Sequence, residues 1–432
     1  MKTKYLMLLP LALLVSCGKS GDPDNGKGQK EKKGPFDAVV GEALPDWAEG
    51  CLDIHAISTG RGECTFFILP DGTSMCVDAG EVETSTTSPV SVTQRPNAST
   101  RPYFTQARYM KHFLAATGHD YLDYMVMTHF HVDHFGTPTG KDFVKSSEGY
   151  CQTGIMAIFT TLPYKKLLDR AYSADDPDYR FMTESGQIYS ASALPDYANF
   201  VRYATTKKGL QMERFKAGVD DQLVLNYGKE KYPSFRIFNY AVNGEYWNGK
   251  ALVDAYGTAI PNENGNCTIF LLSYGKFDYY TAGDAGGNTK MAVPVAKSIG
   301  KKIEAMKADH HMSTHCVGDP LSGNSGDQMK VVQPLVIATQ SFARRLDQPV
   351  IETVSALLDG RYYDEGRKPS LYFTNIDDVI YTPNQALYSQ THVNGHIVIR
   401  VVPGGDSFYV YQLDDTNNYY KVKSIEGPFL CE

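Results

Sequence analysis

The sequence has no apolar run approaching the roughly 18 residues of a membrane-spanning helix, which excludes a polytopic membrane protein. It has no Cys-x-x-Cys pair and no short repeated cysteine spacing, so its eight cysteines indicate no metal cluster. Histidine is scarce: six of the 11 histidines lie in two windows, Thr128–His134 and His310–His315. No histidine lies between these windows, so any shared role requires the fold to bring them together.

The composition excludes a wholly disordered chain. Of the 432 residues, 42% are apolar and 21% are charged, which is enough for a sizeable core. The formal charge of -7 argues against bulk electrostatic binding of nucleic acid. It does not exclude a nucleic acid as a substrate that is bound locally.

The N-terminal residues predict an export signal and a tether. Lys2 and Lys4 precede the apolar run Tyr5–Val15, which is too short to span a membrane. At its end, Leu14–Cys17 resembles a bacterial lipobox. We expect a signal peptide at 1–16, lipidation of Cys17, a flexible tether at 17–34 and one folded domain at 35–432. The protein would then be lipid-anchored in the cell envelope, on the periplasmic face or the cell surface, without spanning the membrane. An ordinary signal peptide with a chance cysteine is the alternative.

Hairpins, helices and strands alternate in the rest of the chain. Both histidine windows follow the same order of predicted elements, namely a hairpin, a helix and a short buried strand, which favours a layered α/β fold. The predicted strands are 64–69, 74–77, 124–127, 235–242, 267–274, 277–281, 305–308, 331–338, 397–402 and 408–411, and the predicted helices are 105–117, 163–172, 197–206, 291–299 and 349–358.

The first window carries the strongest chemical signal. His129, His131, Asp133 and His134 form the pattern HxHxDH directly after a predicted buried strand. Three imidazoles and a carboxylate this close together suit a metal site, with zinc as the first choice and manganese or iron as alternatives. A histidine-rich loop without metal is the competing interpretation.

More ligands are needed than one loop supplies. Asp284 follows the hairpin at 267–281, and its two carboxylate oxygens could bridge two metals. By itself an aspartate at a strand end is usually a turn or helix cap. His310 and His311 follow the predicted strand at 305–308 and offer another imidazole.

Five segments together resemble the metallo-β-lactamase superfamily, and within it the hydrolase domain of the ComEC-like DNA-internalisation proteins. The HxHxDH loop is specific for the superfamily, whereas the assignment to the ComEC-like group depends on weaker motifs. The five segments, in order, are Ser58–Thr65 (DVGQGDA-like), Val77–Gly80 (IDxG-like), Thr128–His134, Thr281–Asp284 (TGD-like) and Lys307–Ser313 (KxxHHGS-like).

The resemblance implies a four-layer αββα sandwich with a one- or two-metal site, and an insertion at about 140–257 after the HxHxDH loop. By position, His129 and His131 would hold the first metal, and Asp133, His134 and His310 the second. Asp284 would bridge the metals. Asp133 and His311 are the predicted catalytic groups, with His311 facing the substrate as a donor or acid. Asp78 would support a ligand from behind.

The sequence departs from the superfamily at the first metal. Most members supply another histidine from a segment between the HxHxDH loop and the bridging aspartate, and this chain has none there. Asn264 and Asn266 lie at about that place and could offer an amide oxygen, or they could belong to a turn before a strand. His315 could reach the site or lie on the surface.

The predicted function is hydrolysis by a metal-activated hydroxide, and the ComEC-like resemblance favours phosphodiesters or other phosphoesters, small or oligomeric. Two rival hypotheses stay open: a β-lactamase-like amide or ester hydrolase, and a surface lipoprotein that binds a ligand at a degenerate metal site.

Overall fold

Eighteen strands form two nine-stranded sheets in the described part of the chain. The computed structural model describes residues 33–82, 92–137, 144–180, 194–287, 289–314, 325–342 and 348–432. Residues Gly34–Glu432 form one structural unit. The first sheet has the strand order β18-β17-β16-β1-β2-β3-β4-β5-β6, and the second has the order β15-β14-β13-β12-β11-β10-β7-β8-β9.

The strands of the first sheet are β1 (Leu52–Ala56), β2 (Thr65–Ile68), β3 (Ser74–Val77), β4 (Leu122–Val126), β5 (Tyr164–Asp169), β6 (Gln211–Arg214), β16 (His396–Val401), β17 (Ser407–Leu413) and β18 (Val422–Leu430). Those of the second sheet are β7 (Phe235–Val242), β8 (Glu245–Trp247), β9 (Leu252–Asp254), β10 (Ile269–Tyr274), β11 (Phe277–Thr281), β12 (Ala305–Lys307), β13 (Val336–Thr339), β14 (Ser370–Phe373) and β15 (His392–Val393).

Apolar residues on both faces of the strands explain how the sheets stack. In β2, Phe67 packs into a core between the two sheets, whereas Phe66 and Ile68 pack into a core on the opposite face. In β10, Leu272 enters the inter-sheet core and Leu271 enters a third core outside the second sheet. Because successive side chains of a strand point to opposite faces, each central strand serves two cores at once.

Helices close the two outer cores. Residues of α1, α3 and α5 pack on the first sheet, and residues of α6, α7 and α8 pack on the second. The described α-helices are α1 (Pro102–Leu114), α2 (Val132–Phe135), α3 (Gly154–Thr161), α5 (Leu194–Lys208), α6 (Ala292–Ile299), α7 (Ser325–Val332), α8 (Ile351–Leu358), α9 (Asp378–Tyr381) and α10 (Gln385–Tyr388). The short 3₁₀ helices are η1 (Ala115–Thr117), η3 (Lys229–Lys231), η4 (Glu263–Asn266), η5 (Asp309–Met312) and η6 (Thr382–Asn384).

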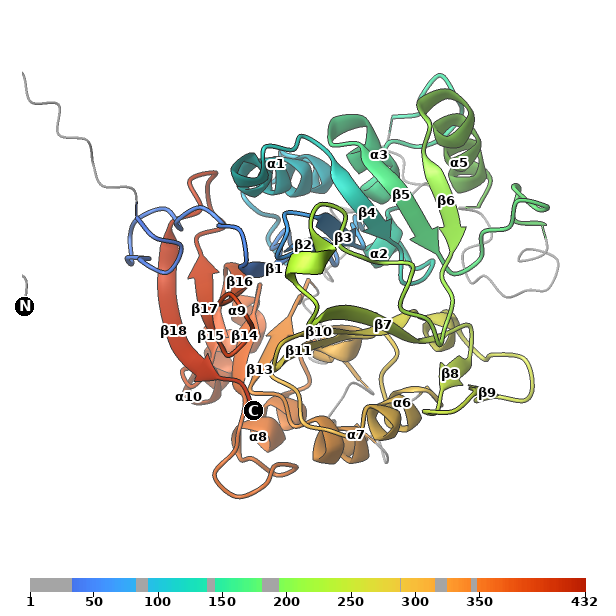
Figure 1. Ribbon diagram of the computed structural model, residues 1–432. Coiled ribbons are helices and arrows are strands. Elements are labelled where there is room, and N and C mark those ends of the chain that lie inside the picture. The colour runs from blue at the N-terminus through green and yellow to red at the C-terminus, as the bar shows by residue number, and fades with distance from the viewer. Residues whose placement is uncertain are drawn as a thin grey trace, which may run out of the picture. The chain divides into compact units, whose positions relative to one another are not determined.

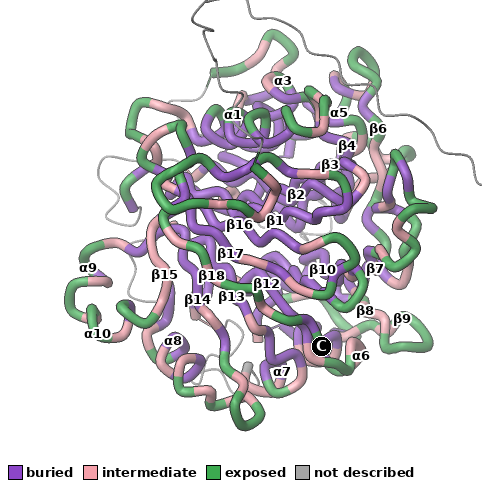
Figure 2. Tube along the Cα trace, turned by 60° about the vertical axis from the view of Figure 1, so that its left-hand side comes forward, coloured by how far each residue is buried: buried purple, intermediate pink, exposed green. Residues whose placement is uncertain are grey.

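The resulting order of layers is helix, sheet, sheet, helix (Figure 1), and the strands run through the buried interior (Figure 2). The predicted fold class, a mixed α/β αββα sandwich, is confirmed. Within the described residues, the helices are all too short or too polar to cross a membrane.

The segment at about 140–257 contributes to both sheets. It adds β5 and β6 to the edge of the first sheet and β7, β8 and β9 to the second. The helix predicted at 163–172 is wrong, because Tyr164–Asp169 is strand β5. Its apolar residues have helical spacing, but parallel pairing with β4 on one side and β6 on the other fixes an extended conformation.

Candidate metal centre

The HxHxDH loop leaves the carboxyl end of β4 and turns back at once. His129 and His131 precede the single helical turn α2, which carries Asp133 and His134. The loop lies against the end of the parallel neighbour β3, where Ala79 N donates to His134 O at 2.8 Å. A Cβ atom at position 80 would lie 1.7 Å from Asp133 O, so Gly80 lets the two backbones approach.

Asp284 and the His310–His311 pair reach the same place from the second sheet. Asp284 follows β11, and the pair lies in η5 after β12, which runs parallel to β11. Parallel strands bring their carboxyl ends to one edge, where a site can form. Residues more than 150 positions apart in the sequence thereby meet at the edges of two stacked sheets.

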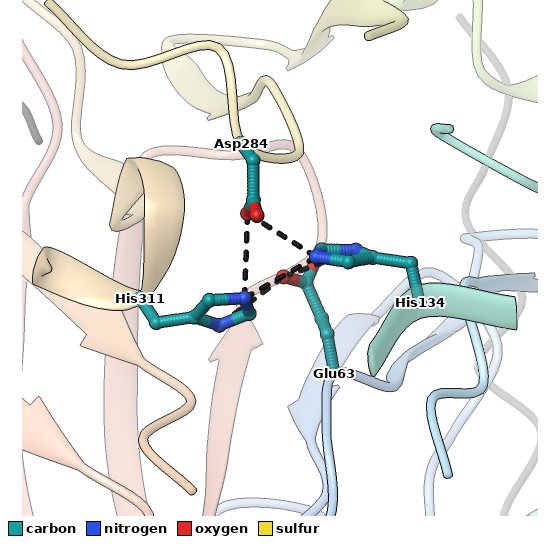
Figure 3. A group of neighbouring side chains, drawn as sticks. All are labelled: Glu63, His134, Asp284 and His311. Carbon is teal, nitrogen blue, oxygen red and sulfur yellow. Dashed lines mark hydrogen bonds and ion pairs between the residues drawn. The ribbon is translucent and has the colours of Figure 1, made fainter. Parts of the chain in front are cut away.

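One group of side chains surrounds the Oδ1 atom of Asp284 (Figure 3). His134 Nε2 lies 3.2 Å and His311 Nε2 lies 3.3 Å from this oxygen, and the two nitrogens are 3.2 Å apart. Asp133 Oδ2 lies 3.3 Å from His311 Nε2 and 3.9 Å from His134 Nε2. Glu63 completes the group, with Oε2 3.8 Å from His134 Nδ1.

A second group lies on the Oδ2 side of the same carboxylate. His129 Nε2 is 3.8 Å from Asp284 Oδ2 and 3.0 Å from His131 Nδ1. His129, His131 and Asp284 offer ligand atoms that all lie within 4.8 Å of one another. Asp284 therefore faces two clusters of ligand atoms with its two oxygens.

The imidazoles are oriented by hydrogen bonds to their Nδ1 atoms. His311 Nδ1 donates to Gln340 O at 3.0 Å, and His134 Nδ1 donates to Asp78 Oδ2 at 2.8 Å. These acceptors direct Nε2 of each ring at the cluster. Burial alone would lower the pKa of both rings, but Asp284 and the neighbouring carboxylates raise the pKa of His134 well above its ordinary value and that of His311 to about 9, so a bound metal would take the place of the Nε2 protons. Metal-binding histidines in proteins almost always donate their other ring N–H in this way.

Glu63 and Lys307 form a buried ion pair behind the site, with Lys307 Nζ 2.8 Å from Glu63 Oε2 and 3.9 Å from Asp284 Oδ1. Burial alone would lower the pKa of Lys307, but these carboxylates raise it above the ordinary lysine value. Neither residue has a role that its sequence pattern predicts, although both lie in segments that carry the family resemblance. Their contact depends on the meeting of the loop before β2 with the end of strand β12, and it has no local sequence signal.

Charge in the cluster favours a bound cation. Burial alone would raise the pKa of Asp284, but His134 and His311 hold it well below the usual range, so Asp284 is an anion at neutral pH. Burial and the neighbouring His134 and His131 lower the pKa of His129 well below its ordinary value. That ring is therefore neutral and keeps a lone pair for a metal.

The residues fit one or two divalent metal ions. Asp284 Oδ1 is buried and accepts no hydrogen bond in the described part of the chain, although two imidazole nitrogens lie within 3.3 Å. Ligands about 2.0–2.1 Å from a tetrahedral zinc ion lie roughly 3.4 Å from one another. The separations of 3.0–3.9 Å in both groups match that spacing. Imidazole and carboxylate ligands suit zinc, manganese or iron.

The structure brings the predicted metal ligands of both windows together, and it exchanges the places expected for His310 and His311. His311 is 1% exposed and lies beside His134 and Asp133, where His310 was expected. His310 is 26% exposed and lies nearer to Asp284 Oδ2, at 3.9 Å from its Nε2.

The other residues that the sequence singles out lie behind the site, beside the HxHxDH loop, or outside the described part of the chain. Asp78 lies behind the site, where it accepts from His134 Nδ1, Thr128 N and Thr128 Oγ1. Asn264 and Asn266 are buried in η4, beside the HxHxDH loop, and the Oδ1 atom of each has no hydrogen-bond partner among the described residues. His315 and Cys17 lie outside the described residues.

No family model matches the sequence, and no curated protein matches it. Among solved structures, the chain is similar to CmlA, a diiron β-hydroxylase from Streptomyces venezuelae, with a TM-score of 0.36 and 13% identity over 83% of this chain and 55% of that chain. A mutant form of CmlA matches with a TM-score of 0.36 and 14% identity over 74% of this chain and 52% of that chain. The chain thus spans about half the length of the CmlA chains.

A diphosphatase of the PhnP family is also similar, with a TM-score of 0.31 and 9% identity over 82% of this chain and 98% of that chain. The fold and the residues of the centre define the class of protein at a coarse level. It is an αββα sandwich with a potential metal-binding cluster at the edge of both sheets.

Proposed function

We propose that the chain is a metal-dependent hydrolase of the metallo-β-lactamase superfamily that cleaves phosphodiesters or other phosphoesters. One observation carries this proposal: the two oxygens of Asp284 each face a separate group of imidazoles, at 3.2–3.8 Å. Imidazoles that served only to pack would destabilise the fold, because each buried polar group costs free energy unless it finds a partner.

Bound divalent ions would lower the pKa of a water molecule toward about 7 and polarise the scissile bond. The chain's own residues do the rest. Asp284 holds both ligand groups at fixed spacing, and the Glu63–Lys307 pair supports it from behind. His131, Asp133 and His310 are only partly buried, so the substrate would approach from their side.

The substrate class and the location rest on the sequence. The ComEC-like motifs around Glu63, Asp78 and Lys307 favour a phosphoester, and the ligand chemistry favours zinc. The lipobox at Leu14–Cys17 favours a lipid anchor in the cell envelope. A nucleic acid is then a candidate oligomeric substrate, bound locally at the site.

The test combines metal analysis with turnover of bis-p-nitrophenyl phosphate by the purified chain. We expect bound zinc, manganese or iron and measurable hydrolysis, both lost on chelation and restored by metal. Asp284→Ala should lower kcat by at least about 1,000-fold, because it removes the group shared by both ligand sets. His131→Ala should reduce metal content and turnover together.

Two exposed residues on or just after α1 provide matched controls. Asp120→Ala and His112→Ala make the same substitutions at exposed positions outside the candidate metal centre and should leave turnover and metal content unchanged. Hydrolysis of amides or lactams in preference to phosphoesters would contradict the substrate class. Bound metal without turnover on any ester, phosphodiester or lactam would show a binding protein instead.

A further inference from the structure

The two histidines that face Asp284 Oδ1 come from different sheets. His134 follows β4 of the first sheet, and His311 follows β12 of the second. Their Nε2 atoms lie 3.2 Å apart, and His311 Nε2 lies 3.3 Å from Asp133 Oδ2. The hydrogen bonds of a strand ladder run within one sheet, so a spacing across two stacked sheets depends on side-chain contacts between them.

Gln340 makes such a contact at the edge where the cluster lies. It directly follows β13, which pairs in parallel with β12 in the second sheet, and it is 1% exposed. Its Oε1 atom accepts from Cys64 N at 2.8 Å, and its Nε2 atom donates to Thr65 Oγ1 at 2.7 Å. Thr65 begins β2 of the first sheet. One buried amide of the second sheet is therefore hydrogen-bonded through both its oxygen and its nitrogen to the first sheet.

The main chain of the same residue holds His311. The carbonyl oxygen of Gln340 accepts from His311 Nδ1 at 3.0 Å. Phe342, two residues further along, packs against the same imidazole, with ring centroids 4.8 Å apart and planes at 83°. The residue that binds the first sheet through its side chain thus orients the ring of His311 through its carbonyl group.

The contact on the first sheet is connected to the HxHxDH loop. Cys64 follows Glu63 in the chain, and Glu63 N donates to Asp133 O at 2.8 Å. A path of covalent and hydrogen bonds therefore connects Asp133 with His311 through Gln340. The path closes on itself, because His311 Nε2 lies 3.3 Å from Asp133 Oδ2. Contacts behind a metal ligand that close in this way fix where the ligand atom lies.

We propose that Gln340 is a positioning residue of the metal centre. Its side-chain amide holds the second sheet so that His311 keeps the distance from the HxHxDH loop that a shared metal ion needs. The two partners, a backbone N–H and a hydroxyl oxygen, are matched by the acceptor and the donor of one carboxamide. This inference rests on the proposed function only in requiring that the centre binds metal.

The test is titration of the metal-free chain with Co²⁺, followed by the visible absorption of the bound ion, which depends on its ligands and their geometry. Gln340→Met keeps the length of the side chain and removes both of its hydrogen bonds. It should weaken binding of at least one cobalt equivalent about 10- to 100-fold and alter the absorption spectrum, which is the usual effect of losing a contact behind a ligand.

Thr65→Val removes only the hydroxyl that accepts from Gln340, and it should change affinity and spectrum in the same direction by less. The double variant should bind cobalt no more weakly than Gln340→Met alone, because that contact is already lost. Additive losses from the two substitutions would show that Gln340 does not act through β2, which would overturn the inference.

Gln333→Met is the matched control. Gln333 lies just before β13, whereas Gln340 lies just after it, and Gln333 is 4% exposed. Its amide also serves as acceptor and donor, because Oε1 accepts from Asp364 N at 2.9 Å and Nε2 donates to Lys330 O at 3.0 Å. Gln333→Met should bind cobalt with the affinity and spectrum of wild type.

The possible outcomes separate this inference from the proposed function. Cobalt binding by Gln340→Met with the affinity and spectrum of wild type would overturn the inference and leave the proposed function standing. Equal weakening by Gln333→Met would also overturn it, since the loss of any buried amide would then suffice. Failure of wild type to bind cobalt would overturn both. If circular dichroism shows that Gln340→Met is unfolded, Thr65→Val decides, and unchanged cobalt binding by that variant overturns the inference.

Discussion

At the scale of single residues, the ion pair of Arg170 and Glu263 holds the HxHxDH loop against the second sheet. Both side chains are completely buried, and the guanidinium binds both carboxylate oxygens at 2.7 Å. Glu263 Oε1 also accepts from Phe130 N, between the ligands His129 and His131. The position of the ligands thus depends on a charge pair that does not itself face the cluster.

Arg170→Met should therefore cost about 3–5 kcal/mol of the free energy of unfolding, because it leaves the Glu263 carboxylate buried without its partner. The measurement is urea unfolding of the metal-free protein. Arg170→Met combined with Glu263→Gln should recover part of this loss, since no uncompensated charge remains. A double variant less stable than Arg170→Met alone would contradict this explanation.

Residue chemistry was also where the sequence was most informative. HxHxDH and the carboxylate at the end of β11 predict a metal site, because few other structures need such side chains so close together. Glu63 and Lys307 were not predicted, since either one alone looks like an ordinary charged residue. The exchange of His310 and His311 depends on left-handed backbone that no side-chain pattern reveals.

At the scale of elements, one buried carboxylate lies just before strand β12. Glu304 precedes β12, where its carboxylate accepts from Asp278 N at 2.8 Å and from Glu432 N at 3.2 Å. Burial raises the pKa of Glu304 to about 7, and these two amides only partly offset that effect. The site of this carboxylate is outside the metal cluster, so its titration can be isolated.

The stability of the protein should fall as pH rises from 4.5 to about 7, the range between the ordinary pKa of a glutamate and the raised pKa of Glu304. Between pH 4.5, the ordinary value, and about 7, the unfolded chain loses a proton that the folded chain keeps. The free energy of unfolding therefore decreases over this range, by up to roughly 3 kcal/mol, and the contribution is constant at higher pH. Urea unfolding at pH 5 and pH 8 measures it.

Glu304→Gln is the comparison for this prediction. The variant should lose less stability than wild type between the two pH values, because the amide does not ionise. Other titrating groups are common to both proteins and cancel in the difference. An identical pH dependence of the two proteins would show that Glu304 titrates normally.

The sequence predicts a helix or strand correctly where its local hydrophobic pattern favours the same conformation as its tertiary contacts. Strands β2, β3, β7, β10 and β11 and helices α1, α5, α6 and α8 lie close to their predicted positions. The segment of strand β5 predicts a helix from its sequence, because its apolar residues repeat at three and four positions. Its neighbours β4 and β6 impose the extended form, and that pairing cannot be deduced from the segment alone.

At the scale of the whole molecule, the ligands come from both sheets. His129, His131 and His134 follow β4 of the first sheet, and Asp284 and His311 follow strands of the second. Bound metal should therefore oppose separation of the sheets. At a free metal concentration 100 times Kd, binding to one site adds about 2.7 kcal/mol to the free energy of unfolding.

Chelation of the wild-type protein should lower its midpoint of thermal unfolding, and zinc should restore it. Calorimetry with and without chelator checks this outcome. Asp284→Ala should unfold at nearly the same temperature in both conditions, since it cannot link the two ligand groups. If chelator left the midpoint of thermal unfolding of the wild-type protein unchanged, bound metal would not stabilise the association of the two sheets.

The order of strands in the first sheet affects how the chain can fold as it is synthesised. Strand β1 pairs with β16, and Leu52 lies opposite Val401. Until residues 396–401 are available, β1 has an open edge, and the inter-sheet core that it shares with the second sheet is incomplete. A nascent chain therefore stays exposed to aggregation until residues 396–401 have emerged, and its folding is slow because its closing contact is so distant in the sequence.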